Sequence, residues 1–306
     1  MFNPASGSGR AERWARWAGS RLEEEGEAFA LASTSKEGNL HSLDGREVSV
    51  DPSHWKECWV VGGDGTLHQL VGRFDQGFCP IAILPCGTGN VVARDLGIPL
   101  RRAAAFRAIR AGRVVPYDLG KCNGRRFTFM VSAGLDALAV HQFHRWRQKC
   151  KGLPRIAYLL AALSQAEVER RGDRFQLKVD GVPLGGVSYV AILNARHYAG
   201  GFILSPQADP FDGRLTVVYL RDPIAARPLR VVHAFLRKSL PRLPDAGCLD
   251  ARSVRVDGVQ FVQIDGEPWQ ASSLECHIEK GALPMRASLE CARRIASMEA
   301  NSPRDC

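Results

Sequence analysis

The chain has 306 residues, of which 45% are hydrophobic, and a formal net charge of +9. This length is enough for two domains with ordinary cores, and no apolar run approaches the roughly 20 residues that cross a bilayer, so we expect a cytoplasmic protein. The nine cysteines form no CxxC pair and no Cys/His cluster at metal spacing, which argues against a zinc site and against a disulfide framework.

Residues 1–118 predict an α/β domain, because apolar runs typical of strands alternate with stretches typical of helices. This part of the chain contains three loops rich in glycine and small polar residues. The first lies near the start of the chain, and each of the other two follows an expected strand. The carboxyl ends of parallel strands meet at one edge of a sheet, so these loops predict one nucleotide site. The expected elements are a helix over 11–25, a strand over 58–61, a helix after Thr66, a strand over 81–84, and helices after Asn90 and over 102–110.

Only Met1 and Phe2 precede the first loop, where a domain of this kind normally has a strand. That strand would lie near the middle of a parallel sheet. Its absence would leave buried backbone groups unpaired beside an apolar gap, at a cost of several kcal/mol. We hypothesise that the natural start lies upstream; equal thermal stability of a version extended by an upstream strand would contradict this.

Residues 119–286 predict a β-sandwich, because short β-rich runs are separated by turns at Asp180-Gly181, Asp212-Gly213 and Asp257-Gly258. Helices after Pro154 and Pro228 are expected to interrupt it, and residues 287–306 predict a C-terminal helical tail. The expected strands cover 126–132, 174–179, 187–193, 215–219, 253–256, 259–264 and 274–278.

The loop Gly62-Gly63-Asp64-Gly65-Thr66 carries the clearest chemical signal. Its glycines permit a sharp turn that brings backbone N–H groups close to an anion, and the helix that follows favours negative charge at its N-terminus. Asp64 then stands where a Mg²⁺ on nucleotide phosphates would lie. The alternative is a plain strand-to-helix turn in which Asp64 caps the helix.

Taken in order, the motifs resemble the diacylglycerol kinase catalytic-domain family, which includes bacterial lipid kinases and sphingosine kinases. Three of them are Asn-Pro-x-Ser-Gly, Gly-Gly-Asp-Gly-Thr and Pro-x-Gly-Thr-x-Asn, at residues 3–7, 62–66 and 85–90. The others are Asp-Leu-Gly at 118–120, Gly-Leu-Asp-Ala at 134–137, Ala-Asp-Pro-Phe-Asp-Gly at 208–213 and Ile-Asp-Gly-Glu at 264–267. The resemblance therefore covers nearly the whole chain.

The resemblance implies transfer of the γ-phosphate of ATP to a lipid hydroxyl, with the active site in a cleft between the two domains. It implies that Asp265 is the base, supported by Glu267, although an Asp-Gly β-turn alone explains the same residues. The implied nucleotide-binding residues are Asn3, Ser6, Gly62, Gly63, Asp64, Gly65, Thr66, Gly87, Thr88 and Asn90. The implied Mg²⁺ ligands are Asp64, with Asp118 as helper, and Asp209 and Asp212 at a second, structural metal. Phe211 and Val91 stand where family members often have acidic residues, which weakens the second metal and any further nucleotide contact. Asp136 is another candidate site residue, or a helix cap.

The positive charge favours an anionic membrane surface as a peripheral partner, because basic and large apolar residues are interleaved over 144–160 and 220–243. The alternative is a pair of amphipathic elements with solvated charged faces. No nucleic-acid-binding motif organises the charge, so nucleic acid is not expected as a partner, and a homodimer is possible. The sequence does not specify the acceptor lipid. A soluble NAD kinase and a non-catalytic nucleotide-binding protein remain the competing functions.

Overall fold

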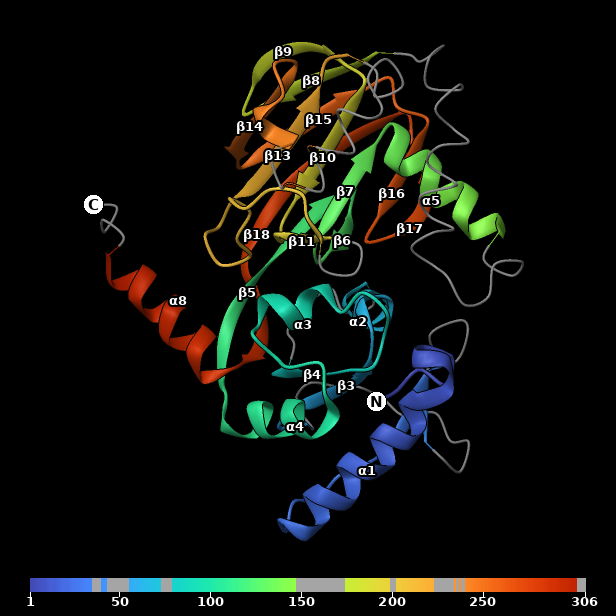
Figure 1. Cartoon of the computed structure of the whole chain (residues 1–306), viewed down its shortest axis with the longest axis vertical. Coiled ribbons are helices and arrows are strands. Elements are labelled where there is room, and N and C mark those ends of the chain that lie inside the picture. The colour runs from blue at the N-terminus through green and yellow to red at the C-terminus, as the bar shows by residue number, and fades with distance from the viewer. Residues whose placement is uncertain are drawn as a thin grey trace. The chain divides into compact units, whose positions relative to one another are not determined.

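The computed structural model describes residues 1–34, 40–42, 55–72, 79–146, 174–198, 202–222, 234, 237 and 240–301. They form two compact units (Figure 1). Unit 1 takes Met1–Tyr117 and Lys280–Cys306 with a short piece at 199–201, and unit 2 takes Asp118–Tyr198 and Phe202–Glu279. The division falls where the sequence predicts a boundary near 118, but residues 280–286, which we expected in the second domain, belong to unit 1.

Unit 1 has the predicted α/β architecture. Strands β3 (Cys58–Gly62) and β4 (Ile81–Pro85) pair in parallel, from Cys58↔Ile81 to Gly62↔Pro85. The far end of β18 (Ser273–Ala287) adds a parallel pair, Met285↔Ile81. Helix α1 buries Ala11, Ala15 and Ala18, which recur at helical spacing along one face. The elements are α1 (Arg10–Glu24), β1 (Ala32–Thr34), β2 (Leu40–Ser42), β3 (Cys58–Gly62), α2 (Asp64–Val71), β4 (Ile81–Pro85), α3 (Val91–Asp95), α4 (Arg102–Ala111) and α8 (Leu289–Asn301).

The C-terminal helix α8 docks on unit 1, which the sequence did not specify. It buries Cys291, Ala292 and Ile295. The N–H of Ser288 donates to the carbonyl of Leu96 at 3.0 Å, just beyond the end of α3. Of the apolar residues expected along this helix, Ala292 and Ile295 are buried, whereas Leu289 and Met298 are exposed.

Unit 2 is the predicted β-sandwich. One sheet has the strand order β14-β13-β10-β7-β16-β17, and the other carries β18-β15-β8-β9. Their facing sides form one core, to which Val190 and Val217 contribute from the first sheet and Leu177 and Val256 from the second. The elements that begin within unit 2 are β6 (Arg125–Phe127), β7 (Met130–Ala133), α5 (Leu135–Trp146), β8 (Phe175–Val179), β9 (Val182–Val187), β10 (Tyr189–Leu193), β11 (His197–Tyr198), β12 (Phe202–Ile203), β13 (Leu215–Leu220), β14 (Ala246–Ala251), β15 (Ser253–Asp257), β16 (Phe261–Ile264), β17 (Glu267–Gln270) and β18 (Ser273–Ala287).

Several strand boundaries differ from the sequence-based expectation. The strand expected over 126–132 is two strands, β6 and β7, because the backbone between them turns its N–H groups to a carboxylate instead of a neighbouring strand. The run over 187–193 is likewise split at Ser188 into β9 and β10. Strand β5 (Arg113–Cys122) was not expected, and the short run at 274–278 is part of the 15-residue β18. The helices expected after Pro154 and Pro228 lie outside the described residues.

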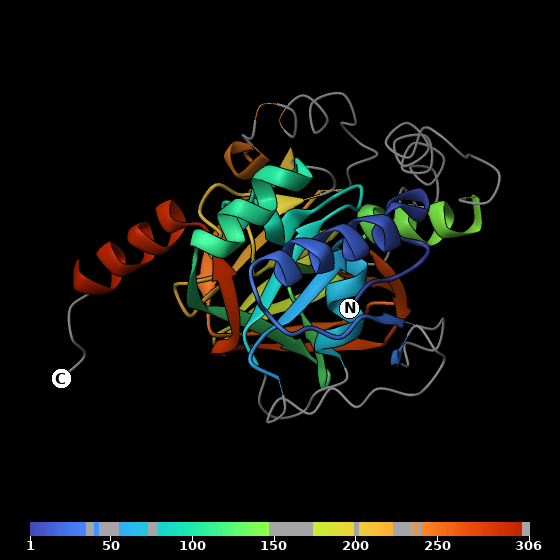
Figure 2. The ribbon, with the colours of Figure 1, turned by 90° about the horizontal axis from the view of Figure 1, so that it is seen from below.

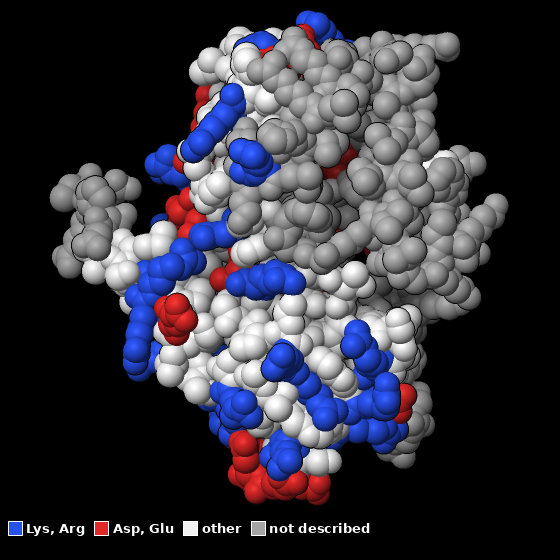
Figure 3. Space-filling model, viewed as in Figure 1, with Lys and Arg blue, Asp and Glu red and all other residues white. Residues whose placement is uncertain are grey.

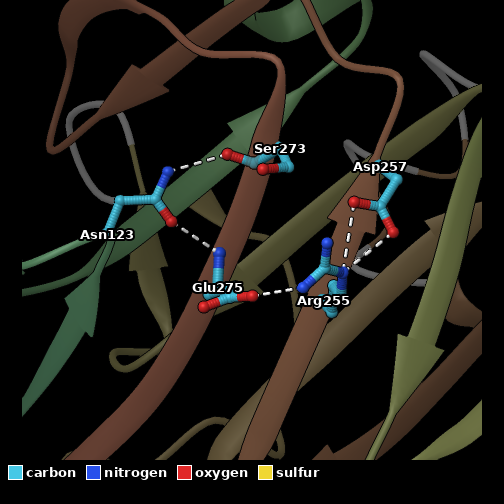
Figure 4. A network of polar contacts seen from close by, with 5 residues as sticks. All are labelled: Asn123, Arg255, Asp257, Ser273 and Glu275. Atoms are coloured by element: carbon cyan, nitrogen blue, oxygen red, sulfur yellow. Dashed lines mark hydrogen bonds and ion pairs between the residues drawn. The ribbon is translucent and has the colours of Figure 1, made fainter.

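A polar network joins the turn at Asn123 to the strands β15 and β18 on the outer side of the sandwich (Figure 4). The amide of Asn123 donates to the carbonyl of Ser273 and accepts from the N–H of Glu275, each at 2.7 Å. Arg255 bonds Glu275 and both carboxylate oxygens of Asp257. Asp257 of the predicted Asp-Gly turn is thus a partner in an exposed ion pair.

No helix in the described part of the chain is both long enough and apolar enough to span a bilayer. Of the segments over 144–160 and 220–243, which we expected to contact a membrane, the structure describes only 144–146, 220–222, 234, 237 and 240–243.

Candidate active site

The three glycine-rich loops of unit 1 lie against one another, as their positions in the sequence predict. The hydroxyls of Ser6 and Thr66 are 3.0 Å apart, which joins the first loop to the second. Arg10 donates to the carbonyls of Gly7 and Cys86, at 2.8 and 3.4 Å, and so joins the first loop to the third. The backbone therefore gathers at the carboxyl ends of β3 and β4, where a phosphate chain could meet several N–H groups.

Close approach of neighbouring backbone segments explains three of the glycines. A Cβ on Gly87 would lie 2.6 Å from the Cα of Gly63, and one on Gly63 would lie 3.0 Å from the Cα of Gly87. A Cβ on Gly7, whose φ is +60°, would lie 2.4 Å from the carbonyl oxygen of Cys86. The loops can touch only because these positions have no side chain.

Replacing Gly87 by Ala is expected to lower the free energy of unfolding by about 2 kcal/mol or more, because the new methyl group meets backbone that cannot move aside. Gly65→Ala is the matched control for stability, since a Cβ there has nothing within 4 Å. Urea unfolding of both variants measures the difference. Equal midpoints would show that the contact between the two loops is not a packing constraint.

Asp64 does not cap its own helix. It is the first residue of α2, the N-cap is Gly63, and no side-chain cap is formed there. Its Oδ1 instead accepts the backbone N–H of Val92 at 3.2 Å, at the start of α3. Asp64 is therefore a helix cap, as the alternative interpretation expects, but it caps α3 and not its own helix α2.

The predicted nucleotide residues divide into those that shape the loops and those that are exposed. Asn90 is buried, and its amide both accepts from the N–H of Gly87 at 3.0 Å and donates to its carbonyl at 2.8 Å. Thr66 is also buried, whereas Gly65 and Thr88 are exposed. Asn3 accepts the N–H of Ala5 at 2.9 Å, which closes the turn that carries Ser6.

Cys86, inside the third loop, is not an activated thiol. Burial raises the pKa of Cys86 to about 11, and the nearby Arg10 guanidinium lowers it only partly. The thiolate is therefore a minor species at neutral pH, and the side chain acts as a small buried group.

In unit 2, Asp118 holds the turn at 209–213. Its carboxylate accepts the N–H of Gly213 at 2.6 Å, and its own N–H donates to the carbonyl of Pro210 at 2.8 Å. Asp209 forms an ion pair with Arg196 at 2.8 Å. Three of the predicted metal ligands, Asp118, Asp209 and Asp212, thus lie around this turn, but they do not form a group that could hold a metal ion.

Burial and the neighbouring carboxylates raise the affinity of Asp212 for a proton. Desolvation by burial raises the pKa of Asp212 to about 7, against a hydrogen bond from the N–H of Arg214 that lowers it, and the charges of Asp209, Asp250 and Asp118 raise it further. Such mutual repulsion is what a bound cation would relieve. No group of three or more metal-ligating His, Cys, Asp or Glu side chains occurs among the residues that the structure describes.

The raised pKa of Asp212 predicts an unusual pH dependence of stability. Between its ordinary value of 3.8 and about 7, the folded chain binds a proton that the unfolded chain has lost, so the free energy of unfolding falls as pH rises through this window. With allowance for solvent screening, the loss is about 1–2 kcal/mol. Asp212→Asn should remove it. Urea unfolding between pH 4.5 and 8.5 with EDTA present tests this, and parallel curves for the two proteins would contradict it.

Asp265 is buried and accepts four hydrogen bonds. Its Oδ2 accepts the N–H and the hydroxyl of Thr128 at 2.6 and 2.8 Å, and its Oδ1 accepts the N–H groups of Phe129 and Met130 at 2.9 and 3.0 Å. Asp265 and Gly266 form the two-residue turn of the β16–β17 hairpin, with φ of +49° and +83°. Asp265 and Gly266 therefore do form the β-turn that the alternative interpretation expects. A turn alone, however, does not require that the Asp265 carboxylate be buried and hold four donors.

A second polar network, which the sequence did not reveal, supports the same turn. Gln263 accepts the N–H of Gly266 at 2.8 Å and donates to the hydroxyl of Ser132 at 2.8 Å. Ser132 and Tyr198 both donate to the carboxylate of Asp136. Only the buried position of Gln263 on an otherwise apolar strand could have signalled its role. Glu267 is exposed at the start of β17.

The comparisons with known proteins agree with these features. Residues 1–122 match the family model "Diacylglycerol kinase catalytic domain", and residues 129–287 match "YegS C-terminal NAD kinase beta sandwich-like domain". The chain is 32% identical over 234 residues to a Pseudomonas aeruginosa protein named "Probable lipid kinase YegS-like". The matched region covers 72% of this chain and 73% of that protein. It is 27% identical over 267 residues to a Mycobacterium tuberculosis protein named "Diacylglycerol kinase", with 84% of each chain covered.

A solved structure of a proposed diacylglycerol kinase from Bacillus anthracis has the same fold, with a TM-score of 0.71 at 21% identity over 94% of this chain and 95% of that one. The fold, the loops and the matched regions together define an ATP-dependent lipid kinase. Within that class the chain belongs to the diacylglycerol kinase family, with the C-terminal domain of the YegS type.

Proposed function

We propose that this protein transfers the γ-phosphate of ATP to the hydroxyl of a diacylglycerol-type or sphingoid-type lipid, with Mg²⁺ as the required cation. The convergence of the three glycine-rich loops at the ends of β3 and β4 carries the nucleotide half of this proposal, because phosphoryl transfer depends mainly on holding and neutralising the polyphosphate. The N-terminus of α2 and the exposed Gly65 would meet the phosphates, and Thr88 would meet the nucleoside side.

The residues that are present fit Mg²⁺. Kinases usually hold this ion with one or two carboxylates together with phosphate oxygens and water, so a cluster of three side chains is not required. Asp64 would be the protein ligand at the nucleotide. When bound, the ion neutralises charge on the β- and γ-phosphates. Asp209 and Asp212, with Asp118, would take the second, structural ion, because burial and the charges of Asp209 and Asp118 already work against full ionisation of Asp212.

We assign Asp265 as the base that receives the proton of the lipid hydroxyl. The hydroxyl of Thr128, which donates to Oδ2 at 2.8 Å, is the donor that an incoming substrate hydroxyl could replace. The backbone N–H groups at Oδ1 would keep the carboxylate oriented during the exchange. Glu267 would act as an exposed supporting carboxylate.

We further propose peripheral contact with anionic membranes. In Figure 3, Lys and Arg side chains gather on the face of unit 1 that carries α1 and α4. Arg13 of α1, Arg107 of α4 and Arg101 just before α4 are exposed. Such a face attracts acidic headgroups. Co-sedimentation with vesicles that contain phosphatidylserine, but not with neutral vesicles, and its loss at 0.5 M salt would support the contact.

The deciding experiment is incubation with labelled ATP, Mg²⁺ and mixed-lipid vesicles, followed by separation of products that enter the organic phase. A labelled lipid supports the proposal, and its chromatographic identity gives the acceptor. Labelled NADP in a parallel reaction with NAD, without labelled lipid, would favour the soluble NAD kinase. No transfer of either kind, despite ATP binding, would favour a non-catalytic protein.

A further inference from the structure

The side chain of Asn194 is a polar group deep inside unit 2. It follows β10, an apolar strand that lies between β13 and β7 in the first sheet (Figure 1 and, from below, Figure 2). The exposed fraction of Asn194 is 0%. Its Nδ2 donates to the carbonyls of Asp118 and Thr128, at 2.8 Å each. Carbonyl oxygens only accept hydrogen bonds, so the NH₂ end of the amide must face them.

The other end of the same amide shows which part of it the position requires. Oδ1 of Asn194 is buried and accepts no hydrogen bond from any residue that the structure describes. A buried acceptor without a donor is destabilising, and an apolar side chain would avoid that cost. The amide offers two N–H donors that an apolar side chain lacks. The carbonyls that receive these donors therefore indicate what the residue does.

Asn194 joins two strands just beyond the point where their pairing ends. The last pair between β5 and β6 is Gly120↔Phe127. Past this pair, the amide of Asn194 donates to one carbonyl on each backbone, Asp118 on β5 and Thr128 just after β6. A single side chain thus ties the end of β6 to the buried strand β5.

The chain bends over residues 128 and 129, between β6 and β7. The N–H groups of Thr128, Phe129 and Met130 all donate to the carboxylate of Asp265. Successive residues of an extended strand point to opposite sides, so three consecutive N–H groups converge on one carboxylate only where the backbone bends. Asn194 holds the carbonyls of this bend, because its backbone N–H donates to Phe129 at 2.9 Å and its Nδ2 donates to Thr128.

We propose that Asn194 is a positioning residue for Asp265. By fixing the carbonyls of Thr128 and Phe129, it keeps the bend in the form that aims three backbone N–H groups at the carboxylate. This inference rests on the proposed function, in which Asp265 receives the proton of the lipid hydroxyl. When the lipid hydroxyl replaces the Thr128 hydroxyl at Oδ2, the backbone donors alone keep the carboxylate in line with the acceptor.

Asn194→Ala removes both side-chain donors and is expected to lower kcat for lipid phosphorylation about tenfold to a hundredfold per folded molecule. KM for ATP should stay within about twofold, because the proposed nucleotide loops belong to unit 1. Ser188→Ala is the matched control. Ser188 is also buried in unit 2, and its hydroxyl donates to the carbonyls of Leu220 and Asp222 instead of to the bend. Its kcat should stay within about twofold of wild type.

A double-mutant cycle separates positioning of the base from general destabilisation. If Asn194 acts through Asp265, adding Asn194→Ala to Asp265→Asn should change the residual rate per folded molecule by less than about twofold. The same addition should still lower the melting temperature, because the two carbonyls lose their donor. Losses of rate that multiply in the double variant would overturn the inference.

Hydrogen exchange tests the inference without substrate. In Asn194→Ala the amides of Thr128, Phe129 and Met130 should exchange at least about tenfold faster, whereas Ser188→Ala should leave them unchanged. Unchanged exchange in Asn194→Ala would overturn the inference. Should Asn194→Ala fail to fold, Asn194→Ser keeps one donor and should show the same effects at smaller size. A wild-type chain that labels no lipid would instead contradict the proposed function, since the exchange result does not depend on activity.

Discussion

Replacing Asp265 by Asn is expected to reduce the rate of lipid phosphorylation by about two to four orders of magnitude if Asp265 is the base. The same change should also destabilise unit 2. The Asn amide nitrogen cannot accept hydrogen bonds, so two of the four donors now held by the carboxylate would face an N–H group in a buried site. Each unsatisfied buried donor costs about 1–3 kcal/mol. The rate must therefore be measured per folded molecule, at a temperature well below the melting point of the variant.

Thr128→Val separates the chemical role of Asp265 from its structural one. It removes only the hydroxyl that donates to Oδ2, at 2.8 Å, and keeps the three backbone donors and the carboxylate. We expect a loss of about 1 kcal/mol in stability and less than a tenfold loss in rate. If Thr128→Val loses as much activity as Asp265→Asn, then Asp265 acts by positioning the backbone at 128–130. An unchanged rate per folded molecule in Asp265→Asn would remove it from the mechanism.

Replacing Asp64 by Asn is expected to lower kcat/KM for ATP by about a hundredfold or more, with little change in melting temperature. Asn keeps an oxygen that can accept the N–H of Val92, so the cap of α3 is preserved. It removes the negative charge that a Mg²⁺ on the phosphates would require. A steady-state titration with Mg²⁺ should show a requirement shifted to higher concentration.

Asp64→Ala is the partner variant for this test. It removes both the charge and the cap, so it should match Asp64→Asn in rate and lose about 1 kcal/mol more in stability. Wild-type activity in Asp64→Asn, together with lower stability in Asp64→Ala, would mean that the residue is only a cap.

Local chemistry allowed the nucleotide half of the candidate site to be predicted. A glycine loop between a strand and a helix is recognisable within a few residues, and parallel strands place successive loops at one edge. The contact of Ser6 with Thr66 and the close approach of Gly63 to Gly87 agree with that prediction. The role of Asp64 as a cap could not be predicted, because its partner Val92 is 28 residues away on another helix.

The part of the candidate site in unit 2, around Asp265, could be predicted less completely from the sequence. Asp265 is joined to Thr128 across 137 residues, and Gln263 to Ser132 across 131. Neither Thr128 nor Gln263 belongs to a local motif. Their importance follows from the rule that buried polar groups need partners, and burial is known only once the strands are placed.

By itself, the sequence determined the α/β and β-sandwich halves, their boundary near residue 118 and the order of the glycine-rich motifs, because hydrophobic periodicity and turn chemistry are properties of neighbouring residues. Only the tertiary structure decided that β18 serves both units, and that the carboxylate of Asp265 is buried against Thr128. These features depend on segments far apart in the chain, which folding brings together through packing and hydrogen bonds that no local pattern encodes.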